Sequence, residues 1–470
     1  MRSKLLTLAL VIILLFTGCT SATQEPNFSQ NDLIYFIMTD RFNDGDNGND
    51  NFTDVNSDDP KAYHGGDLKG IIDKLDYIKS LGATTIWVTP IVKNQPTGYH
   101  GYWAYDFYSV DPHLGTMDNF KKLVDEAHNK DIKVILDYVV NHTGYDSPWL
   151  KDEEKKDWFH PNREITDWAN QEIVENGWLA GLPDLDQSNP KVKDFLIKNA
   201  LWWIDETGID GMRLDTVRHV PKEFWKEFAT EIKKEYPDFY FLGEVWSDNT
   251  RYLELYHQSG IDGLTNYSLY EGIRNAFTRF GSTATLVNAI KKEKYFSTPE
   301  LNGVFLDNHD NRRLISDGGE NGKEYLKQAL TFVMTYPSIP IIYYGTEIGM
   351  EGKSDPDNRR DMEWDKVGNS EIYDFYMKLV DLRNNSPALK SKEFKLLDYD
   401  KYFISYLRKD NDSSILVVMN TLNKDKSITI NLPNESSKYR DILSDNLYTV
   451  VDNQIKIELE PLDILILQSY

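Results

Sequence analysis

The ends of several apolar runs carry residues that could do acid–base or nucleophilic chemistry. In "GMRLDTVRHV", Arg213 and Asp215 are two residues apart, and residues two apart in a β-strand face the same side. "GEVW" adds Glu244, and "FLDNHD" adds Asp310. Two carboxyl groups that face one cleft could hydrolyse a glycosidic bond, one as nucleophile and the other as proton donor.

The neighbours of these carboxyl groups predict different protonation states. An opposite charge within a few ångströms lowers a carboxyl pKa, so Arg213 is expected to keep Asp215 ionised. Glu244 has no cation beside it in the sequence and is flanked by Val245 and Trp246. Because an apolar setting raises a carboxyl pKa, Glu244 is expected to be the acid.

Strands and helices that would position these residues alternate from residue 32 to residue 388. Short apolar runs such as "LIYFIM", "TTIWVTP" and "IPIIYYGTEIGM" are separated by amphipathic stretches, one of which ends at Gly208 just before "GMRLD". Such alternation predicts a parallel sheet and an α/β fold. We expect eight strands closed into a (β/α)8 TIM barrel, whose active site lies at the carboxyl ends of the strands.

Two other segments depart from this alternation. Residues 143–186 are rich in Trp and Gly and are expected to form a small subdomain inserted after the third strand. Residues 389–470 alternate apolar and polar positions with a period of two between turn-rich gaps. That pattern predicts a C-terminal antiparallel β-sandwich domain.

The N-terminal residues are typical of a targeting segment. An apolar run at 5–16 follows two basic residues and ends shortly before Cys19, the single cysteine of the chain. The run is too short to span a membrane and suits a signal peptide. The stretch resembles a bacterial lipoprotein signal, which implies that residues 1–18 are removed, that Cys19 carries a lipid and that residues 19–31 form a tether. An ordinary signal of a secreted protein is the alternative.

Composition restricts the classes of partner. The 470 residues include 52 Lys and Arg against 75 Asp and Glu, which gives a net charge of −23. A surface this acidic repels phosphate backbones, so nucleic acid is not an expected partner. With one cysteine, no intramolecular disulfide can form, and the core must hold the fold. We expect a monomer.

The motifs, in this order and spacing, resemble the α-amylase family of retaining glycoside hydrolases from about Leu33 onward. The matching segments are "GYHGYWAYDFYSVDPHLGT", "DYVVNH", "LPDLD", "GMRLDTVRH", "GEVW", "FLDNHD" and "DPDNRRDMEW". The resemblance implies that Asp215 is the nucleophile and Glu244 the general acid/base. It implies that Asp310 hydrogen-bonds the 2- and 3-hydroxyls of the distorted sugar.

The resemblance also implies a set of substrate-binding residues. Three histidines would contact the sugar at the −1 subsite, and Tyr102 would be its stacking platform. Arg218 replaces the lysine more usual at its position, which we interpret as a changed +2 contact. The complete expected set is His100, Tyr102, His142, Arg213, Arg218, His219 and His309.

Two clusters of oxygen-bearing residues suggest Ca²⁺, a hard cation that prefers oxygen ligands. The loop "NDGDNGND" could equally be a solvated turn, but it is similar to the N-terminal calcium loop of cyclodextrin glucanotransferases and some bacterial amylases. Its expected ligands are Asp44, Asp46, Asn49, Asp50, Asp67 and the carbonyl of Gly65. The family's site between barrel and subdomain would use Asn141, Asp184 and the main-chain carbonyl of His219. No other cofactor is implied.

The function expected from the resemblance is retaining endo-hydrolysis of α-1,4-glucosidic bonds in starch and maltodextrins through a covalent glycosyl-enzyme. One alternative is a cyclodextrin glucanotransferase, which normally has further C-terminal β domains. Another is a neopullulanase or cyclomaltodextrinase, which usually has an extra N-terminal domain and "MPKLN" in place of "LPDLD". Outside these, a non-catalytic starch-binding protein on the same barrel would typically lack a catalytic carboxylate, and this chain keeps all three.

Overall fold

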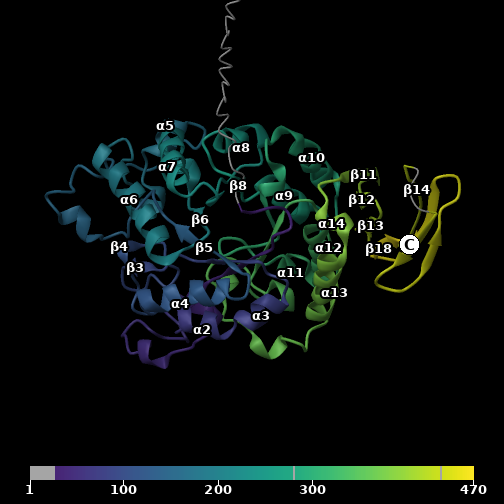
Figure 1. Cartoon of the computed structure of the whole chain (residues 1–470), viewed down its shortest axis with the longest axis horizontal. Coiled ribbons are helices and arrows are strands. Elements are labelled where there is room, and N and C mark those ends of the chain that lie inside the picture. The colour runs from purple at the N-terminus through teal and green to yellow at the C-terminus, as the bar shows by residue number, and fades with distance from the viewer. Residues whose placement is uncertain (1–26, 279–280, 434–436) are drawn as a thin grey trace, which may run out of the picture.

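Eight parallel strands form the predicted barrel. The computed structural model describes residues 27–278, 281–433 and 437–470 (Figure 1). The strands follow the order β8-β7-β6-β5-β2-β1-β10-β9, and a parallel bridge between Thr265 and Gly303 joins the two ends. The strands are β1 (Ile34–Ile37), β2 (Thr85–Val88), β5 (Lys133–Tyr138), β6 (Gly211–Leu214), β7 (Tyr240–Gly243), β8 (Gly263–Leu264), β9 (Gly303–Phe305) and β10 (Ile339–Tyr343).

Helices cover the outside of the barrel. Because both faces of the sheet are thereby covered, its strands are buried along almost their whole length rather than at alternate residues. The helix before β6 begins with Asn189 as its cap and ends at Gly208 in a left-handed conformation (φ 69°), as the sequence predicts. The helices are α1 (Thr39–Phe42), α2 (Leu68–Asp73), α3 (Leu75–Ser80), α4 (Met117–His128), α5 (Gln171–Glu175), α6 (Pro190–Thr207), α7 (Lys222–Glu235), α8 (Thr250–His257), α9 (Tyr267–Ala276), α10 (Ala284–Lys292), α11 (Leu314–Asp317), α12 (Gly322–Thr335), α13 (Glu371–Asn385) and α14 (Pro387–Lys390).

The C-terminal β domain lies beside α12, α13 and α14 (Figure 1). Its larger sheet is antiparallel, with one face against the barrel helices and the other against the pair β14–β17. The central strand β13 is therefore buried on both faces, whereas β17 alternates. Gln328 of α12 donates to the carbonyl oxygens of Asn420 and Leu462 across the interface. The strands are β11 (Phe394–Tyr399), β12 (Phe403–Lys409), β13 (Ser414–Asn420), β14 (Lys426–Asn431), β15 (Lys438–Asp441), β16 (Leu447–Thr449), β17 (Gln454–Leu459) and β18 (Ile464–Ser469).

Two insertions build up the carboxyl end of the barrel. The hairpin β3 (Val92–Asn94) and β4 (Ala104–Val110) follows β2. The segment 143–186 follows β5 and contains only α5 and short 3-10 turns. A bridge between His142 and Asp184 ties the two ends of this subdomain together.

The expected signal peptide and Cys19 lie outside the described residues. The last residues of the expected tether pack on the barrel, because Phe28 is buried and stacks on Tyr240 with ring centroids 4.3 Å apart. The folded domain thus begins before Asp32. Within the described ranges, no helix combines the length and the apolar character needed to cross a membrane.

Candidate active site

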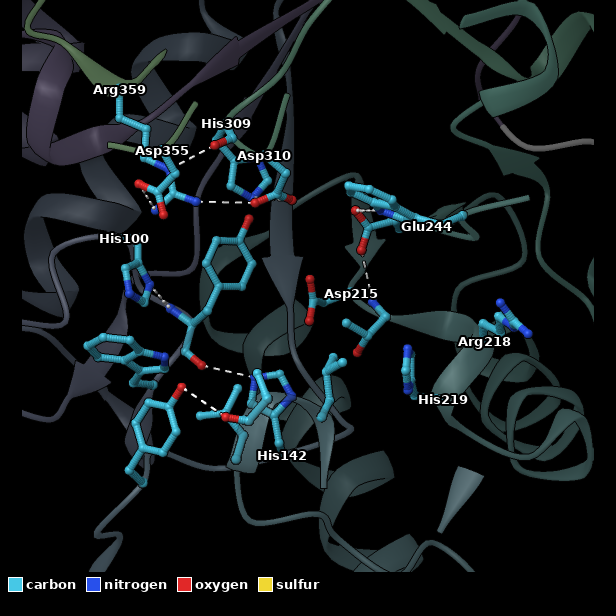
Figure 2. A pocket seen from close by; sticks show the side chains of 18 of the residues that line it. His100, His142, Asp215, Arg218, His219, Glu244, His309, Asp310, Asp355 and Arg359 are labelled. Carbon is cyan, nitrogen blue, oxygen red and sulfur yellow. Dashed lines mark hydrogen bonds and ion pairs between the residues drawn. The ribbon is translucent and has the colours of Figure 1, made fainter. Parts of the chain in front are cut away.

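One pocket of about 670 Å³ lies at the carboxyl ends of the barrel strands. It contains all three predicted catalytic carboxyl groups and six of the seven predicted substrate-binding residues. Figure 2 shows Arg359, Asp355 and His100 toward one end and Arg218 and His219 toward the other, with the catalytic carboxyl groups between them. The predicted residues in its lining are His100, Tyr102, His142, Asp215, Arg218, His219, Glu244, His309 and Asp310.

Arg213 is the exception, because it is 1% exposed and contacts carboxylates rather than the pocket. Its Nη1 lies 2.9 Å from an oxygen of Asp137 and 2.7 Å from Oδ1 of Asp215. Its Nη2 lies 2.6 Å from Oε1 of Glu244. One guanidinium therefore holds three carboxyl groups from three neighbouring strands.

This geometry corrects the expected setting of Glu244. The sequence places no cation beside it, yet Arg213 pairs with it across the sheet. Its Oε1 also accepts from Trp246 Nε1 at 3.0 Å, and its Oε2 accepts from the backbone N–H of Thr216 at 3.1 Å. Thr216 has a left-handed backbone (φ 45°), a strained conformation that persists where the surroundings enforce it, often at functional sites. Glu244 is thus oriented by three donors rather than set in an apolar wall.

The ionisation of Asp215 also differs from the sequence expectation. Burial raises the pKa of Asp215, Arg213 opposes that rise, and Glu244 and Asp137 add to it. Burial likewise raises the pKa of Asp137, to about 6. Arg213 therefore offsets only part of the effect of burial on the pKa values of Asp137 and Asp215.

The sugar-facing side of the pocket is built on Tyr102. Its hydroxyl donates to Asp137 at 2.6 Å, and its ring stacks on His309 with centroids 5.1 Å apart. Its N–H donates to Nδ1 of His100 at 3.1 Å, and its carbonyl accepts from Nε2 of His142 at 3.1 Å. Tyr102 therefore connects all three histidines.

These histidines are neutral at pH 7. Burial lowers the pKa of His100, His142 and His309, to about 4 for His142. Burial also lowers the pKa of His219 to about 4. A neutral imidazole can donate a hydrogen bond to a sugar hydroxyl without placing a cation beside the positive charge of an oxocarbenium-like transition state.

Arg218 lies at the other end of the pocket. One of its terminal nitrogens donates to the carbonyl oxygen of Trp168 in the inserted subdomain. Its guanidinium carbon lies 5.9 Å from the ring centroid of Tyr252. Arg218 thus helps to hold the inserted subdomain against the barrel. Its contact with a sugar at the +2 subsite stays a prediction.

Two residues that orient the site, Asp137 and Arg359, were not assigned a role from the sequence. Arg359 is 8% exposed and donates to Oδ1 of Asp310 at 3.2 Å and to the carbonyl of His309 at 2.8 Å. Asp137 orients both Arg213 and Tyr102. The segments "DYVVNH" and "DPDNRRDMEW" contain Asp137 and Arg359, so the motifs were a signal for both.

The first expected calcium cluster has oxygen atoms without partners. Oδ1 of Asn49 and Oδ1 of Asp50 are buried and accept no hydrogen bond. A Cβ added to Gly65 (φ 96°) would lie 2.7 Å from Oδ1 of Asp50, so the Gly65 backbone closely approaches this carboxylate. Asn49 donates to Oδ2 of Asp67 at 3.1 Å. Burial, then the charges of Asp44, Asp67 and Asp46, raise the pKa of Asp50.

Within that loop, Asp44 and Asp46 are exposed and accept from neighbouring groups of the loop itself. The buried part, with the unpartnered oxygens of Asn49 and Asp50, fits a hard cation. In the described part of the chain, no three or more His, Cys, Asp or Glu side chains form a metal-binding group. Calcium also takes amide and main-chain oxygens, such as those expected from Asn49 and Gly65.

The second expected calcium cluster also holds unpartnered oxygens. Oδ1 of Asn141 and Oδ1 of Asp184 are buried without partners. The other carboxylate oxygen of Asp184 lies 2.6 Å from Nδ1 of His160. Burial raises the pKa of Asp184 to about 7. A cation bound to Oδ1 of Asp184 would compensate the charge of this buried carboxylate, so Asn141 and Asp184 together fit calcium. His219, the third expected member of this cluster, lines the catalytic pocket.

Comparisons with known proteins identify the family of the chain. Residues 36–370 match the family model for the alpha amylase catalytic domain, and residues 394–466 match the maltogenic amylase C-terminal domain. The beta/alpha-amylase of Paenibacillus polymyxa is 40% identical over 451 residues, which cover 92% of this chain but only 37% of that protein. A cyclomaltodextrinase of a Bacillus species is 36% identical over 430 residues, 86% of this chain and 75% of that protein. Neopullulanase 2 of Thermoactinomyces vulgaris is 32% identical over 468 residues, 94% and 78% of the two chains.

Solved structures match as well. The α-amylase of Anoxybacillus superposes with a TM-score of 0.89 at 47% identity, covering 93% of this chain and 98% of that one. The α-amylase of Geobacillus thermoleovorans, solved with acarbose, superposes with a TM-score of 0.86 at 46% identity and the same coverage. The chain therefore belongs to the α-amylase family and is a glycoside hydrolase, with a catalytic barrel followed by a maltogenic-amylase-type C-terminal domain.

Proposed function

We propose that the enzyme hydrolyses α-1,4-glucosidic bonds of maltodextrins with retention of configuration, and that cyclodextrins and pullulan are among its substrates. The relatives named cyclomaltodextrinase and neopullulanase, which this chain covers over about three quarters of their length, favour this reading over a plain endo-acting amylase. The endo-amylase that the sequence suggests is the second candidate. It is favoured by the Anoxybacillus and Geobacillus structures, which are named α-amylases and share nearly half of their residues with this chain.

The observation that supports the chemistry best is the pair of carboxyl groups on one guanidinium. Asp215 and Glu244 bind different terminal nitrogens of Arg213, which holds them close to each other. Retaining glycosidases need their two carboxyl groups about 5–5.5 Å apart, whereas inverting enzymes leave a wider gap for water. The shared guanidinium favours the retaining arrangement.

In the first step, a carboxylate oxygen of Asp215 attacks the anomeric carbon of the −1 sugar. Glu244 gives its proton to the glycosidic oxygen, so the leaving sugar departs as an alcohol. Asp310, held by Arg359 at 3.2 Å, accepts hydrogen bonds from the hydroxyls of the −1 ring. These bonds strengthen as the ring flattens and acquires positive charge.

In the second step, Glu244 acts as a base. It takes a proton from water, which attacks the anomeric carbon and releases Asp215 with the original configuration restored. Trp246, Thr216 and Arg213 hold Glu244 in one orientation through both steps. Positioning by three donors avoids reorganisation at the moment of proton transfer.

Calcium would act on structure rather than on the reacting atoms. Asn49, Asp50 and Asp67 would hold one ion in the loop that follows β1, and Asn141 with Asp184 would hold another beside the subdomain. Either ion would neutralise buried carboxylate charge and fix a loop of the pocket rim. We also propose that Cys19 carries a lipid that anchors a monomeric enzyme outside the cytoplasm.

A time course on soluble starch, pullulan and β-cyclodextrin, with products resolved by size, tests the proposal. Cleavage of cyclodextrin or pullulan at rates comparable to starch supports the cyclomaltodextrinase or neopullulanase group. A rapid fall in starch chain length with the other two substrates untouched would support the endo-amylase instead. An Asp215→Asn variant is the matched inactive control.

A further inference from the structure

His113 joins two loops of the barrel domain, one after β1 and the other after β4. Its Nδ1 lies 2.6 Å from Oδ1 of Asp111, and its Nε2 lies 3.0 Å from Oδ1 of Asp54. The ring stacks on Tyr63 with centroids 3.8 Å apart, and the Phe52 ring lies 4.2 Å from it. With its side chain 12% exposed, His113 is held by both loops in one orientation.

This arrangement needs a protonated imidazole. Both ring nitrogens face carboxylate oxygens, and an imidazole donates from both nitrogens only when it is a cation. Burial opposes the charged form, but Asp111 and Asp54 outweigh it and raise the pKa of His113. The hydroxyl of Tyr63 also faces Asp111, at 3.3 Å, and the charge of His113 acts on Asp50 as well. The neighbours of His113 in both loops therefore favour its cationic form.

The same two carboxylates hold the β3–β4 hairpin. Oδ2 of Asp54 accepts from the backbone N–H of Thr97 in the hairpin loop at 3.0 Å. Oδ2 of Asp111 accepts from the backbone N–H of Asn94, at the end of β3, at 2.8 Å. Thr97 has a left-handed backbone (φ 67°), a strained conformation for a β-branched residue that persists where its surroundings enforce it. By fixing both carboxylates, His113 fixes the hairpin at two points.

Asn94 carries this link to Tyr102. The Asn94 side chain is buried, with the residue 7% exposed. Its Nδ2 donates to the carbonyl oxygen of Gly101 at 3.1 Å, and its Oδ1 accepts from the backbone N–H of Trp103 at 2.6 Å. Gly101 has a φ of 91°, and a Cβ there would lie 2.0 Å from the carbonyl oxygen of Pro90. One amide thus brackets the backbone of Tyr102 in a turn with little room to shift.

The position of Tyr102 decides the geometry of the sugar-facing wall. Its ring stacks on His309, and its hydroxyl donates to Asp137. A displacement of its backbone would therefore move the ring and the hydroxyl together. Because binding groups must be held within about 0.5 Å of their productive positions, a small shift of this turn is enough to weaken the binding of a sugar.

We propose that protonated His113 holds the backbone of Tyr102 in place through Asn94, which makes His113 a pH-dependent positioning residue for the −1 sugar. The proposal rests on the proposed function, since it takes Tyr102 as the platform of that sugar. When the ring of His113 loses its proton, one nitrogen presents a lone pair to a carboxylate, and the hold on the hairpin loosens. The positioning effect is therefore present below the raised pKa of His113 and is lost as the pH rises through it.

Sugar binding as a function of pH tests this proposal. In the inactive Asp215→Asn background, calorimetry measures the Kd of maltotriose between pH 6 and pH 10, with and without His113→Gln, whose amide oxygen would face one of the two carboxylates. We expect His113→Gln to bind about tenfold more weakly at pH 6, the effect of one lost charged hydrogen bond. The difference should disappear as the pH rises and His113 of the parent protein loses its proton.

His128→Gln is the matched control. His128 pairs with Asp210 at 2.8 Å in the last turn of α4, and that hydrogen bond also raises its pKa. The control should bind maltotriose like the parent protein at every pH, and melting curves verify that each variant is folded. A parent-like Kd for His113→Gln at pH 6, or a weakening that is the same at every pH, overturns the proposal.

Asn94→Ser tests the route from His113 to Tyr102. It removes both side-chain contacts to the turn and should weaken maltotriose binding at every pH. Since both substitutions act through the same turn, the double variant His113→Gln/Asn94→Ser should bind no more weakly than Asn94→Ser alone. Additive losses would mean that His113 acts by another route and would overturn the proposal.

Hydrogen exchange separates failure of this proposal from failure of the proposed function, because it needs no sugar. At pH 6, mass spectrometry of the peptide that spans residues 94–103 should show faster exchange in His113→Gln than in the wild type, and wild-type exchange in His128→Gln. Unchanged exchange in His113→Gln overturns the proposal. Faster exchange in His113→Gln, together with a wild type that neither binds nor cleaves maltooligosaccharides, refutes the proposed function alone.

Discussion

Asp137 offers the sharpest test of how the catalytic cluster is organised. It touches no bound sugar in the proposed mechanism, but its carboxylate accepts from Arg213 at 2.9 and 3.1 Å, from Tyr102 Oη at 2.6 Å and from Trp87 Nε1 at 3.1 Å. We predict that Asp137→Asn lowers both stability and activity. It should also shift the pH dependence of catalysis.

The magnitude follows from the contacts. An asparagine has one acceptor oxygen, which can keep the bonds to Tyr102 and Trp87. Its NH2 group then faces Arg213 in place of the oxygen at 2.9 Å. A lost hydrogen bond to a charged group costs about 1.5–3 kcal/mol. If the lost hydrogen bond destabilises the transition state by that energy, kcat/KM falls by about 10- to 100-fold.

The pH dependence has a definite sign. The charge of Asp137 is one of the causes that raise the pKa of Asp215. Removing this charge lowers the pKa of Asp215, so the nucleophile stays ionised to lower pH. The acid limb of the kcat/KM profile should therefore move to lower pH even though the maximum falls.

A stability loss alone would not produce that shift. Asp262 provides the control, because its side chain is 10% exposed, pairs with Lys233 and precedes β8 at the opposite end of the barrel. Asp262→Asn should lower the melting temperature and leave the pH profile in place. An Asp137→Asn enzyme with wild-type kcat/KM and an unmoved acid limb would refute the role of Asp137.

Three further predictions address stability and localisation. Burial raises the pKa of Glu293 to about 8, above about 4.3 for an unfolded glutamate. The contribution of Glu293 to stability is therefore greatest below the unfolded pKa and is lost as pH rises through the folded pKa. Between pH 6 and 9, the melting temperature of Glu293→Gln should decrease less than that of the wild type. Excess EGTA should lower the melting temperature of the wild type by several degrees, a change that Asp50→Ala should reduce; an identical wild-type melting curve would argue against both calcium sites. Cys19→Ser should move the protein from the membrane fraction to the medium, and continued membrane association would exclude Cys19 as the anchor.

The elements and the main site residues could be predicted from the sequence because both obey short-range rules. The eight strands are short, mainly apolar runs, and the carboxyl ends of parallel strands share one rim. Asp215, Glu244 and Asp310 each follow such a run, so their meeting in one pocket required no knowledge of side-chain direction.

The electrostatics could not be predicted in the same way. Arg213 and Glu244 are on neighbouring strands, and their 2.6 Å contact depends on strand register and rotamer rather than on nearby residues in the sequence. The rise in the pKa of Asp215 comes from burial in the completed barrel. The residues next to Asp215 in the sequence do not indicate it. Arg359 reaches Asp310 from a loop 49 residues away, a contact that no periodicity indicates.

Trapping the glycosyl-enzyme tests the central claim most directly. A Glu244→Gln variant, which cannot activate water, is mixed with α-maltotriosyl fluoride, whose leaving group needs no protonation, and the digested protein is analysed by mass spectrometry. We predict a maltotriosyl adduct on the peptide that contains Asp215, and none when Asp215 is also replaced by Asn. An adduct on another residue, or turnover by the wild type to a product of inverted configuration, would contradict the account.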